Sequence, residues 1–537
     1  MQNALAIDSA PRVIAVSTAD GEFHIPFQPG PTLRDILISA GVSLPSVCGG
    51  NAACGQCQIR LAKSADIPFT DGERLRLSSS QRDEGLRLAC QIRPDAGFHV
   101  SLVVPVIQTL WRALRDDEYS PLASPPLLRS SDAPYGVAID LGTTHIRLTL
   151  WDLAEGKRIT GRVGLNPQIS YGADVLARLT KASHSIAHAH EIGTLAERTI
   201  GLALAGMTSA TSIKLSAIGE VVVVGNTAMM SLLSGKNYGL LLQAEYWTRM
   251  IDCQPDDVAF LRTAWRIAEQ ATIRFVPPLG GFIGSDLLAG IIATRLMAQQ
   301  TNALLIDFGT NSEIALWDGR LLHVTSAAGG PAFEGCGISC GMPGETGAIY
   351  RVRQEDNGTL AMDVLGDAKP AGVCGSGLVD AIAWLCRAGK LDKIGRFKGG
   401  IGDGFALSDV NERIVLRRRD IDVFQRAKAA IAAGVCWLCD QSGIRPSELE
   451  RVTICGAFGR LLNVANAQEI GLLPGVAADN VMLEGNAALA GCETLLASEG
   501  AEILLTVQAL ARVHNLAEDA AFERLFVENL YLQPMQE

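Results

Sequence analysis

One pattern occurs twice in this chain: an apolar run, the motif Asp-x-Gly-Thr followed by Thr or Asn, and a second apolar run. The first copy joins Val137–Asp140 to Ile146–Asp152, and the second joins Leu304–Asp307 to Glu313–Asp318. Short apolar runs bounded by turn residues are typical of buried strands. The two aspartates lie 167 positions apart, which is too wide for a solenoid repeat. The pattern therefore predicts an internally duplicated, two-lobed α/β protein.

The two loops have the composition of a phosphate-binding site. A tight glycine turn with free backbone amides and hydroxyls forms a concavity that suits phosphate oxygens. An aspartate at the strand end tolerates the phosphate charge when Mg²⁺ lies between them. Two such loops facing each other would hold a nucleoside triphosphate from both sides. The predicted residues are Asp140, Gly142, Thr143 and Thr144 in the first loop, and Asp307, Gly309, Thr310 and Asn311 in the second.

Further turns predict the rest of a nucleotide cleft. A strand at Val452–Ile454 runs into Cys-Gly-Ala-Phe-Gly, which fits an adenosine-binding turn. Glu334 is a candidate for orienting the attacking water or the metal, although a carboxylate that stabilises a helix start is an equal reading. The other candidates for ligand contact are Asn226, Gly329, Gly330, Gly375, Ser376, Gly456 and Ala457. The chain has no GxxxxGK[ST] motif, which excludes a P-loop. The order of these motifs resembles the acetate and sugar kinase, Hsp70 and actin superfamily (ASKHA).

Four of the thirteen cysteines lie within residues 48–90. Cys48, Cys54, Cys57 and Cys90 follow the spacing C-x5-C-x2-C-x32-C, in which the first three share a Gly-rich loop. Four converging thiolates bind zinc or an iron–sulfur cluster. Zinc usually prefers two C-x2-C pairs, and only one is present, so the pattern favours [2Fe–2S]; zinc or unliganded buried cysteines are the alternatives. The segment resembles β-grasp [2Fe–2S] ferredoxins, with a first gap closer to the adrenodoxin type.

These motifs divide the chain into parts. Residues 1–104 form a predicted ferredoxin-type domain, with strands at Arg12–Thr18 and Glu22–Phe27, a helix at Thr32–Ala40 and a closing strand at Leu102–Val106. Residues 105–134 are rich in Pro and Ser and read as a linker. Residues 135–537 form the predicted ATPase domain, with lobe I at about 135–302 and lobe II at about 303–537. Inside it we expect helices at Ala182–Leu204 and Ser285–Gln299.

Composition excludes several functional classes. The formal net charge of −11 argues against a nucleic-acid binder, which needs a basic face. The chain has no uncharged apolar run of the ~18 residues needed to cross a bilayer, and its N-terminus lacks a secretory pattern. We therefore expect a cytoplasmic protein that uses neither nucleic acid nor membrane.

A ferredoxin unit followed by an actin-like ATPase resembles the reductive activators of corrinoid proteins, which use ATP to return inactive Co(II) corrinoid to Co(I). The resemblance covers essentially the whole chain. It implies a [2Fe–2S] cluster, ATP and Mg²⁺ as cofactors and a cobalamin-binding partner in a methyltransferase or demethylase system. The upstream electron donor and a homodimeric state are left open. The motifs that carry the resemblance are NPQISYGADV (166–175), VVVVGNTAMM (221–230), PPLGGFIGSD (277–286), LLIDFGTNSEIAL (304–316), GGPAFEGCGISCGMPGETGAI (329–349) and VCGSGLVDAI (373–382).

Two other functions remain alternatives from the sequence. One is activation of a different low-potential enzyme, such as a dehydratase. The other is a nucleotide-gated binding module in which the cluster is structural. A plant-type [2Fe–2S] centre has a potential near about −400 mV and the Co(II)/Co(I) couple of a corrinoid lies lower, so unaided transfer is unfavourable. ATP can assist only if its binding favours one conformation over another.

Overall fold

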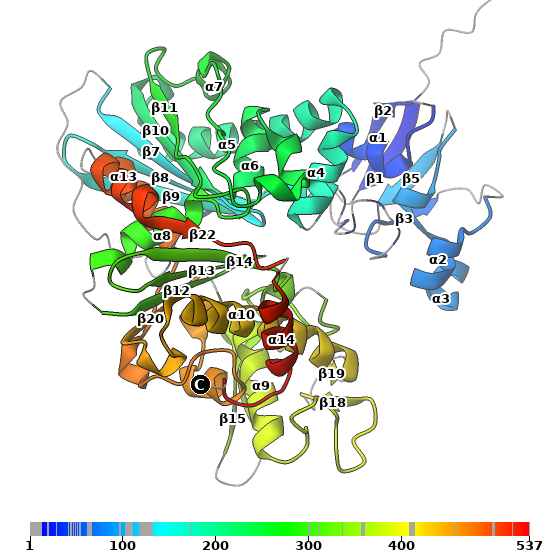
Figure 1. Cartoon of the computed structure of the whole chain (residues 1–537). Coiled ribbons are helices and arrows are strands. Elements are labelled where there is room, and N and C mark those ends of the chain that lie inside the picture. The colour runs from blue at the N-terminus through cyan, green and yellow to red at the C-terminus, as the bar shows by residue number, and fades with distance from the viewer. Residues whose placement is uncertain are drawn as a thin grey trace, which may run out of the picture. The chain divides into compact units, whose positions relative to one another are not determined.

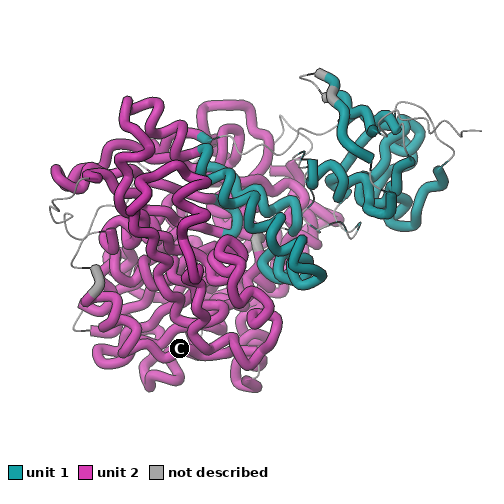
Figure 2. Tube along the Cα trace, turned by 90° about the horizontal axis from the view of Figure 1, so that it is seen from above, with its two compact units in different colours: residues 1–111, 143–145, 164–202 teal, residues 112–142, 146–163, 203–537 magenta. Residues whose placement is uncertain are grey.

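The computed structural model describes most of the chain, and its contacts divide it into two compact units. The first contains residues 1–111, 143–145 and 164–202, and the second contains 112–142, 146–163 and 203–537 (Figure 2). The described residues are 13–18, 21–27, 29–40, 42, 44, 46, 48, 50, 52, 55–61, 67–95, 98–102, 111–115, 118, 133–172, 174–298, 301–309, 311–335, 337–355, 360–407, 414–456, 458–496, 500–517 and 519–535.

The N-terminal part of the first unit is built on a five-stranded sheet with the order β2-β1-β5-β3-β4. Strand β1 pairs antiparallel with β2 and parallel with β5, and β3 pairs antiparallel with β4 and β5. This mixed sheet with one long crossover is the arrangement expected for a β-grasp fold. Its elements are β1 (Val13–Thr18), β2 (Gly21–Pro26), α1 (Leu33–Ser39), β3 (Gln58–Leu61), α2 (Asp71–Arg76), α3 (Ser79–Asp83), β4 (Leu86–Leu88), η1 (Ala89–Gln91) and β5 (His99–Leu102).

Local sequence explains how α1 is placed on this sheet. The Thr32 side chain accepts a hydrogen bond from the Asp35 amide and so caps the helix. Leu33 and Leu37, one turn apart, are fully buried against a core that includes Ile14 and Ile59. The predicted hairpin and helix are confirmed. The closing strand lies earlier than predicted, at His99–Leu102, and residues 103–106 of the predicted strand fall outside the described residues.

The first unit also contains η3 (Pro167–Tyr171), α4 (Val175–Ser183) and the first part of α5 (Ile186–Thr211). The continuous helix predicted at Ala182–Leu204 is wrong at its start, because α4 ends at Ser183 and α5 begins at Ile186. Ser185 explains the second start, since its hydroxyl accepts a hydrogen bond from the His188 amide, as a helix cap does.

The second unit contains two six-stranded sheets with the same internal plan (Figure 1). In each, a hairpin of two antiparallel strands is extended by two further strands on one side and by two parallel strands on the other. The first has the order β11-β10-β7-β8-β9-β6, with β6 (Arg112–Ala113), β7 (Tyr135–Leu141), β8 (His145–Asp152), β9 (Lys157–Leu165), β10 (Ile218–Gly225) and β11 (Thr272–Phe275). The second has the order β21-β20-β12-β13-β14-β22, with β12 (Ala303–Phe308), β13 (Ser312–Trp317), β14 (Leu322–Ala327), β20 (Arg451–Cys455), β21 (Val481–Leu483) and β22 (Ala511–Val513).

This repeated plan confirms the predicted duplication. Asp140 and Asp307 are the penultimate residues of β7 and β12, at equivalent places in the two hairpins. Strand β10 runs parallel to β7 and β20 runs parallel to β12, so the turns after β10 and β20 lie beside the two aspartates.

Two helices, α8 (Ser285–Ala293) and α12 (Ala487–Leu496), pack closely on each other between the sheets. A Cβ atom added to Gly491 would lie 1.9 Å from the Ala289 carbonyl oxygen, so only glycine permits this approach. The core around them draws residues from both sheets, including Val222 of β10 and Leu305 of β12. In Figure 1, α8 lies between the two sheets.

The remaining elements surround the second sheet and the edge of the first. Four phenylalanines, Phe308, Phe333, Phe424 and Phe458, form a cluster of packed rings in the core that includes β12. The elements are α6 (Thr227–Ser234), α7 (Ala259–Trp265), η8 (Pro331–Glu334), β15 (Ala348–Gln354), β16 (Leu360–Val364), β17 (Gly372–Val373), α9 (Gly375–Arg387), β18 (Gly404–Ala406), β19 (Val415–Arg417), α10 (Arg418–Ser442), α11 (Val464–Glu469), α13 (Gly500–Leu510) and α14 (Ala520–Glu528). Among the described residues, no helix is long and apolar enough to cross a membrane.

Candidate functional site

Asp140 lies at the end of β7 with 3% of its surface exposed. Its carboxylate accepts a hydrogen bond of 2.7 Å from Asn486 Nδ2 and lies 3.5 Å from the Arg147 guanidinium. Burial raises the pKa of Asp140, against the opposing effect of these two neighbours. Asn486 precedes α12, so a residue far along the chain holds the predicted aspartate in place.

Asp307 shares an electrostatic site with three other carboxyl groups. Burial and the charge of Asp140 raise the pKa of Asp307 to about 6. Burial and the charges of Asp140 and Asp307 raise the pKa of Asp286, in the first turn of α8, to about 7. Glu313, paired with Asp307 across the hairpin, has its pKa raised well above its usual range by burial and by Asp286 and Asp307. Asp140 and Glu313 are buried, and Asp286 and Asp307 are half-buried. Four carboxyls in one site repel one another, and a bound cation would relieve that repulsion.

Asp286 and Glu313 were not predicted as site residues. Both lie inside motifs that the sequence analysis identified, PPLGGFIGSD and DFGTNSE, but nothing local distinguishes them from ordinary helix-start and strand residues. The available signal for Glu313 was its place opposite Asp307 in a predicted hairpin.

The turn after β10 is locked against the start of α8. Gly225 N donates to Ser285 Oγ at 3.1 Å. A Cβ atom on Gly284 would lie 2.2 Å from Asp286 Oδ1 and 3.0 Å from Asn226 Cα. Asn226 therefore lies beside Asp286, while its side-chain oxygen accepts from the Ala228 amide and caps α6.

The predicted adenosine turn lies against Asp307. Gly456 has φ +93°, and a Cβ there would lie 2.5 Å from the Phe308 carbonyl oxygen and 3.2 Å from Asp307 Oδ1. Gly375, at the start of α9, packs closely against Phe458: a Cβ atom added to Gly375 would lie 2.6 Å from that ring. The structure thus brings Gly375, Gly456 and Asp307 into one neighbourhood.

Other predicted residues have more varied positions. Ser376 Oγ donates to the Tyr350 carbonyl, so its hydroxyl is already engaged. Glu334 is the last residue of η8 and is half-buried. The carboxyl that interacts electrostatically with both Asp140 and Asp307 is that of Asp286. Gly142, Gly309 and Asn311 are half-buried in the two loops, and Gly329 and Gly330 follow β14, Gly330 with φ +68°. Thr310, Ala457 and Cys54 lie outside the described residues.

Three of the predicted cluster ligands lie together in the first unit. Cys57 precedes β3 and Cys90 lies in η1; both are buried, and Cys48 is half-buried. A hydrogen bond with Cys57 lowers the pKa of Cys90 to about 7, and the Gln91 amide and the Ala52 N–H also direct hydrogen bonds at its sulfur. Donors aimed at a thiolate are the surroundings that an iron–sulfur cluster requires. These residues therefore fit a four-cysteine cluster completed by Cys54.

Neither site is a ready-made cage for a bare ion: among the described residues, no group of three or more His, Cys, Asp or Glu side chains is arranged to hold one. For the carboxylate site this is the usual situation, because Mg²⁺ at nucleotide sites is held by one or two carboxylates, waters and the phosphates themselves.

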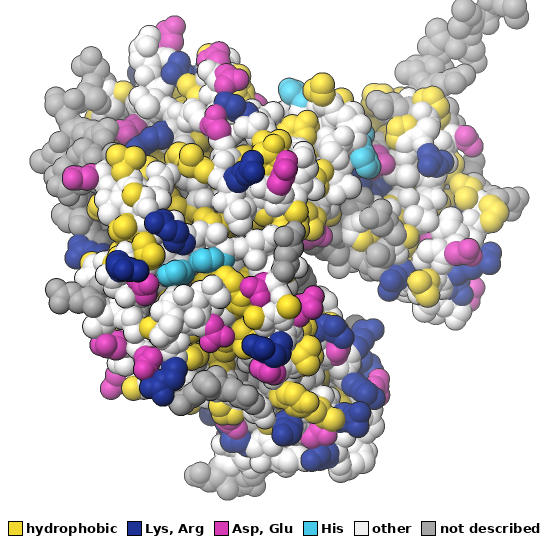
Figure 3. Space-filling view, viewed as in Figure 1, with side chains coloured by type: hydrophobic (Ala, Val, Ile, Leu, Met, Phe, Trp, Pro, Cys, Tyr) yellow, Lys and Arg dark blue, Asp and Glu magenta, His cyan; other side chains and the backbone are white. Residues whose placement is uncertain are grey.

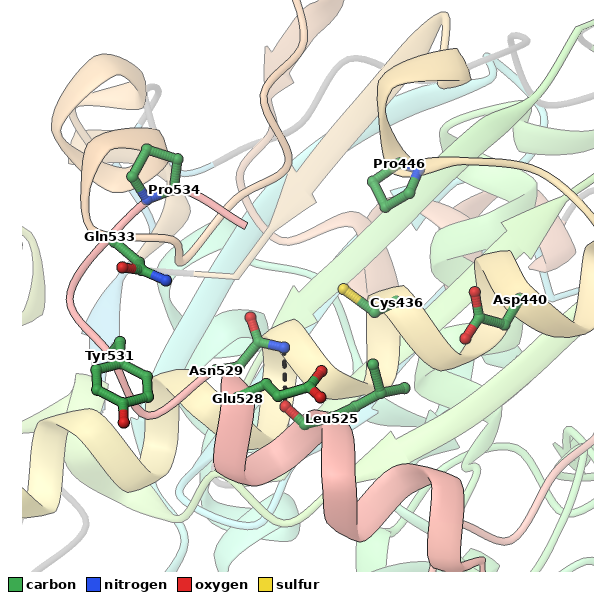
Figure 4. A pocket seen from close by; sticks show the side chains of 9 residues that line it. All are labelled: Cys436, Asp440, Pro446, Leu525, Glu528, Asn529, Tyr531, Gln533 and Pro534. Carbon is green, nitrogen blue, oxygen red and sulfur yellow. Dashed lines mark hydrogen bonds between the residues drawn. The ribbon is translucent and has the colours of Figure 1, made fainter. Parts of the chain in front are cut away.

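A separate cavity of about 190 Å³ lies elsewhere in the second unit, between α10, α14 and the C-terminal residues (Figure 4). Cys436 and Asp440 of α10 line one side, and Glu528, Asn529 and Tyr531 line another. Tyr531 O accepts a hydrogen bond from the fully buried Lys428, so the chain after α14 is an integral part of the fold. Cys436 and Cys439 are buried on α10.

The fold and the two sites define an iron–sulfur protein with an ASKHA-type nucleotide domain. Family models match in the same order: a 2Fe-2S iron-sulfur cluster binding domain over 17–95, the RACo middle region over 135–299, and the C-terminal domain of RACo, the ASKHA domain, over 301–537. The chain belongs to the RACo family of reductive activators of corrinoid proteins, and it is a corrinoid protein reductase with an ASKHA ATPase domain.

Individual relatives agree with this assignment. The chain is 35% identical to the corrinoid activation enzyme RamQ of Eubacterium limosum, over 93% of this chain and 95% of that protein. It is 28% identical to the [Co(II) methylated amine-specific corrinoid protein] reductase of Methanosarcina barkeri, over 66% of this chain and 68% of that protein. The solved structure of a reductive activator for corrinoid, iron-sulfur protein shares the fold, with a TM-score of 0.66 at 24% identity over 97% of this chain and 99% of that one.

Proposed function

We propose that this chain uses Mg²⁺ and ATP to drive one electron from its [2Fe–2S] centre onto the cobalt of a corrinoid protein, converting inactive Co(II) to Co(I). The observation that carries the proposal is that four carboxyls interact electrostatically, among them the aspartates of the two duplicated motifs, in a chain that also gathers Cys48, Cys57 and Cys90. The cluster, when bound, supplies the one-electron reductant.

The carboxyls divide into two roles in this proposal. Asp140 and Asp307 hold the waters of Mg²⁺, and Thr143, Thr144, Thr310 and Asn311 hold the phosphates. Asp286 accepts a proton from the water that attacks the terminal phosphorus, while the bond from that phosphorus to the bridging oxygen breaks and ADP leaves. The raised pKa of Asp286, about 7 in the metal-free site, makes its carboxylate a stronger base than that of a solvent-exposed aspartate. Asp286 takes the place of Glu334 as the proposed water-orienting group.

The partner is proposed from the relatives. One relative is named for a methylated amine-specific corrinoid protein and another for corrinoid activation. We propose that the partner of this chain is a corrinoid protein of a methylamine-type methyltransferase system.

The proposal also keeps the predicted domain boundaries, with the ferredoxin-type domain ending at residue 104 and the ATPase domain beginning at residue 135.

One anaerobic assay tests the function. The reduced protein, MgATP and a Co(II) corrinoid protein of a methylamine system are mixed, and cobalt oxidation state is followed by absorbance. We expect Co(I) to form only with ATP. Cys57→Ser should abolish the transfer, Asp307→Asn should abolish the Co(I) formation that ATP drives, and Cys386→Ser, at a half-buried cysteine outside both sites, is the matched control. Co(I) formation by Cys57→Ser would overturn the electron path.

A further inference from the structure

The motif NPQISYGADV contacts the first phosphate loop at both ends of η3. Asn166 N donates to the Thr144 carbonyl at 2.8 Å. Arg178 of α4 is fully buried and bridges the other end, donating to the Gly172 carbonyl at 2.8 Å and to the Thr143 carbonyl at 2.7 Å. A Cβ on Gly172 would lie 2.4 Å from Ala177 Cβ, so the segment has little freedom to move independently of α4. A displacement of the Thr143–Thr144 backbone is therefore transmitted to η3.

Tyr171, the last residue of η3, joins this segment to Arg34 of α1. Tyr171 is 3% exposed, and Arg34 Cζ lies 6.0 Å from the centre of its ring. Burial and the Glu191 carboxylate raise the pKa of the Tyr171 hydroxyl. Beside this contact, Lys181 Nζ of α4 lies 3.8 Å from Asp35 Oδ1. All of these residues belong to the first unit (Figure 2).

Arg34 in turn lies against the loop that carries Cys48. Its side chain is 1% exposed, Nε donates to Ser46 Oγ at 2.8 Å, and Nη1 donates to Asp35 Oδ1 at 2.7 Å. A Cβ on Gly50, two residues after Cys48, would lie 3.4 Å from Nη1. Within the described part of the chain, the buried Nη2 has no hydrogen-bond acceptor. The buried Arg34 guanidinium beside the cysteine loop would be compensated by the negative charge of a thiolate-bound cluster. Reduction of the cluster increases that negative charge.

We propose that Arg34 is a positioning residue that sets the electron affinity of the cluster, and that Tyr171 makes this setting depend on the nucleotide held by the Thr143–Thr144 loop. Positive charge near the cluster favours its reduced form, so a change in the position of Arg34 changes the reduction potential. The inference rests on the proposed function, because it requires ATP at the phosphate loops.

The test is a set of midpoint potentials of the holoprotein, measured by EPR-monitored titration without nucleotide, with MgADP and with a non-hydrolysable MgATP analogue. In the wild type we expect the ratio of reduced to oxidised cluster at a fixed poise to change about tenfold between states, which is ~59 mV for one electron. Tyr171→Leu removes the ring from Arg34 and should lose most of this shift, whereas Tyr171→Phe keeps the ring and should retain it.

Lys181→Gln removes the neighbouring ion pair between Lys181 and Asp35 without disturbing the core, and Lys157→Gln is its charge-matched control on β9. We expect a smaller nucleotide-dependent shift for Lys181→Gln and an unchanged one for Lys157→Gln.

Calorimetric binding of the analogue separates the two hypotheses. Wild-type protein that binds no nucleotide overturns the proposed function and this inference together. The inference alone is overturned if the wild type binds nucleotide and reduces cobalt but its cluster has the same midpoint potential in all three nucleotide states. It is also overturned if Tyr171→Leu shows the full wild-type shift in midpoint potential.

Discussion

Asp307 and Glu313 lie directly opposite each other across the β12–β13 hairpin, whereas the residue opposite Asp140 in the β7–β8 hairpin is Arg147. The two halves of the duplication thus differ in charge at equivalent positions. In the first half the guanidinium partly compensates the charge of the aspartate, and in the second half the half-buried Asp307 and the buried Glu313 repel each other. We infer that a bound cation stabilises the second hairpin more than the first, because it would offset the repulsion between Asp307 and Glu313.

Glu313→Gln should weaken binding of MgATP by about 10–100-fold, the usual effect of losing a group that supports a metal site. The same change removes a buried carboxyl that is costly to ionise, so the metal-free protein should be no less stable than the wild type. Calorimetry with MgATP and thermal unfolding without metal check the two parts. Glu448→Gln, at an exposed glutamate, is the control, and unchanged MgATP affinity in Glu313→Gln would contradict the assignment.

Asp286→Asn should lower kcat for ATP hydrolysis by about 10²–10⁴-fold while changing nucleotide affinity much less, because a general base acts in the chemical step. The pKa of about 7 belongs to the metal-free site, and bound Mg²⁺ should lower it. The wild-type rate should therefore fall on acidification below neutral pH, and the variant should lose this dependence. Steady-state rates between pH 5.5 and 8 measure both effects. An unaltered kcat would exclude Asp286 as the base.

The metal-free protein should become less stable as pH rises from about 4 to 7. The folded-state pKa values of Asp286 and Asp307, about 7 and about 6, lie above the unfolded value of about 3.9. Between these values the folded state binds more protons than the unfolded state, so the free energy of unfolding falls with rising pH. Urea unfolding in EDTA across this range should show a steeper loss in the wild type than in Asp286→Asn/Asp307→Asn. Equal slopes would contradict the shifts.

Sequence reasoning correctly placed the two aspartates near the ends of buried strands, because each lies between two short apolar runs where local pattern and turn chemistry agree. It also located the cysteine loop, because four thiols at that spacing have few other uses. Sequence reasoning did not identify Asp286 and Glu313 as site residues, and the reason is physical. Their importance comes from neighbours brought close by the fold, α8 against the turn after β10 and β13 against β12, and not from the residues next to them in sequence.

The helix break between α4 and α5 has a similar explanation. The apolar periodicity of residues 182–204 is compatible with one helix, and the interruption depends on a serine cap whose preference over continued helix is small. The link between Arg34 and Tyr171 joins residues 137 positions apart in sequence. No local pattern in either segment indicates its partner.

The crossing of α8 and α12 gives the last prediction, since it joins the cores of the two sheets. Gly491→Ala would place a methyl group 1.9 Å from the Ala289 carbonyl oxygen, so the helices must separate. Overpacking of this kind costs about 1–3 kcal/mol or more, and we expect a lower midpoint of unfolding together with weaker MgATP binding. Gly290→Ala is the matched control on the facing helix, because its added Cβ would lie 3.8 Å from Ala487 Cβ, an ordinary contact. Relief of a helix-interior glycine should leave that variant unchanged or stabilise it by up to about 1 kcal/mol. Thermal and urea unfolding of both variants provide the comparison, and equal stability of the two would show that the helices are not in close contact.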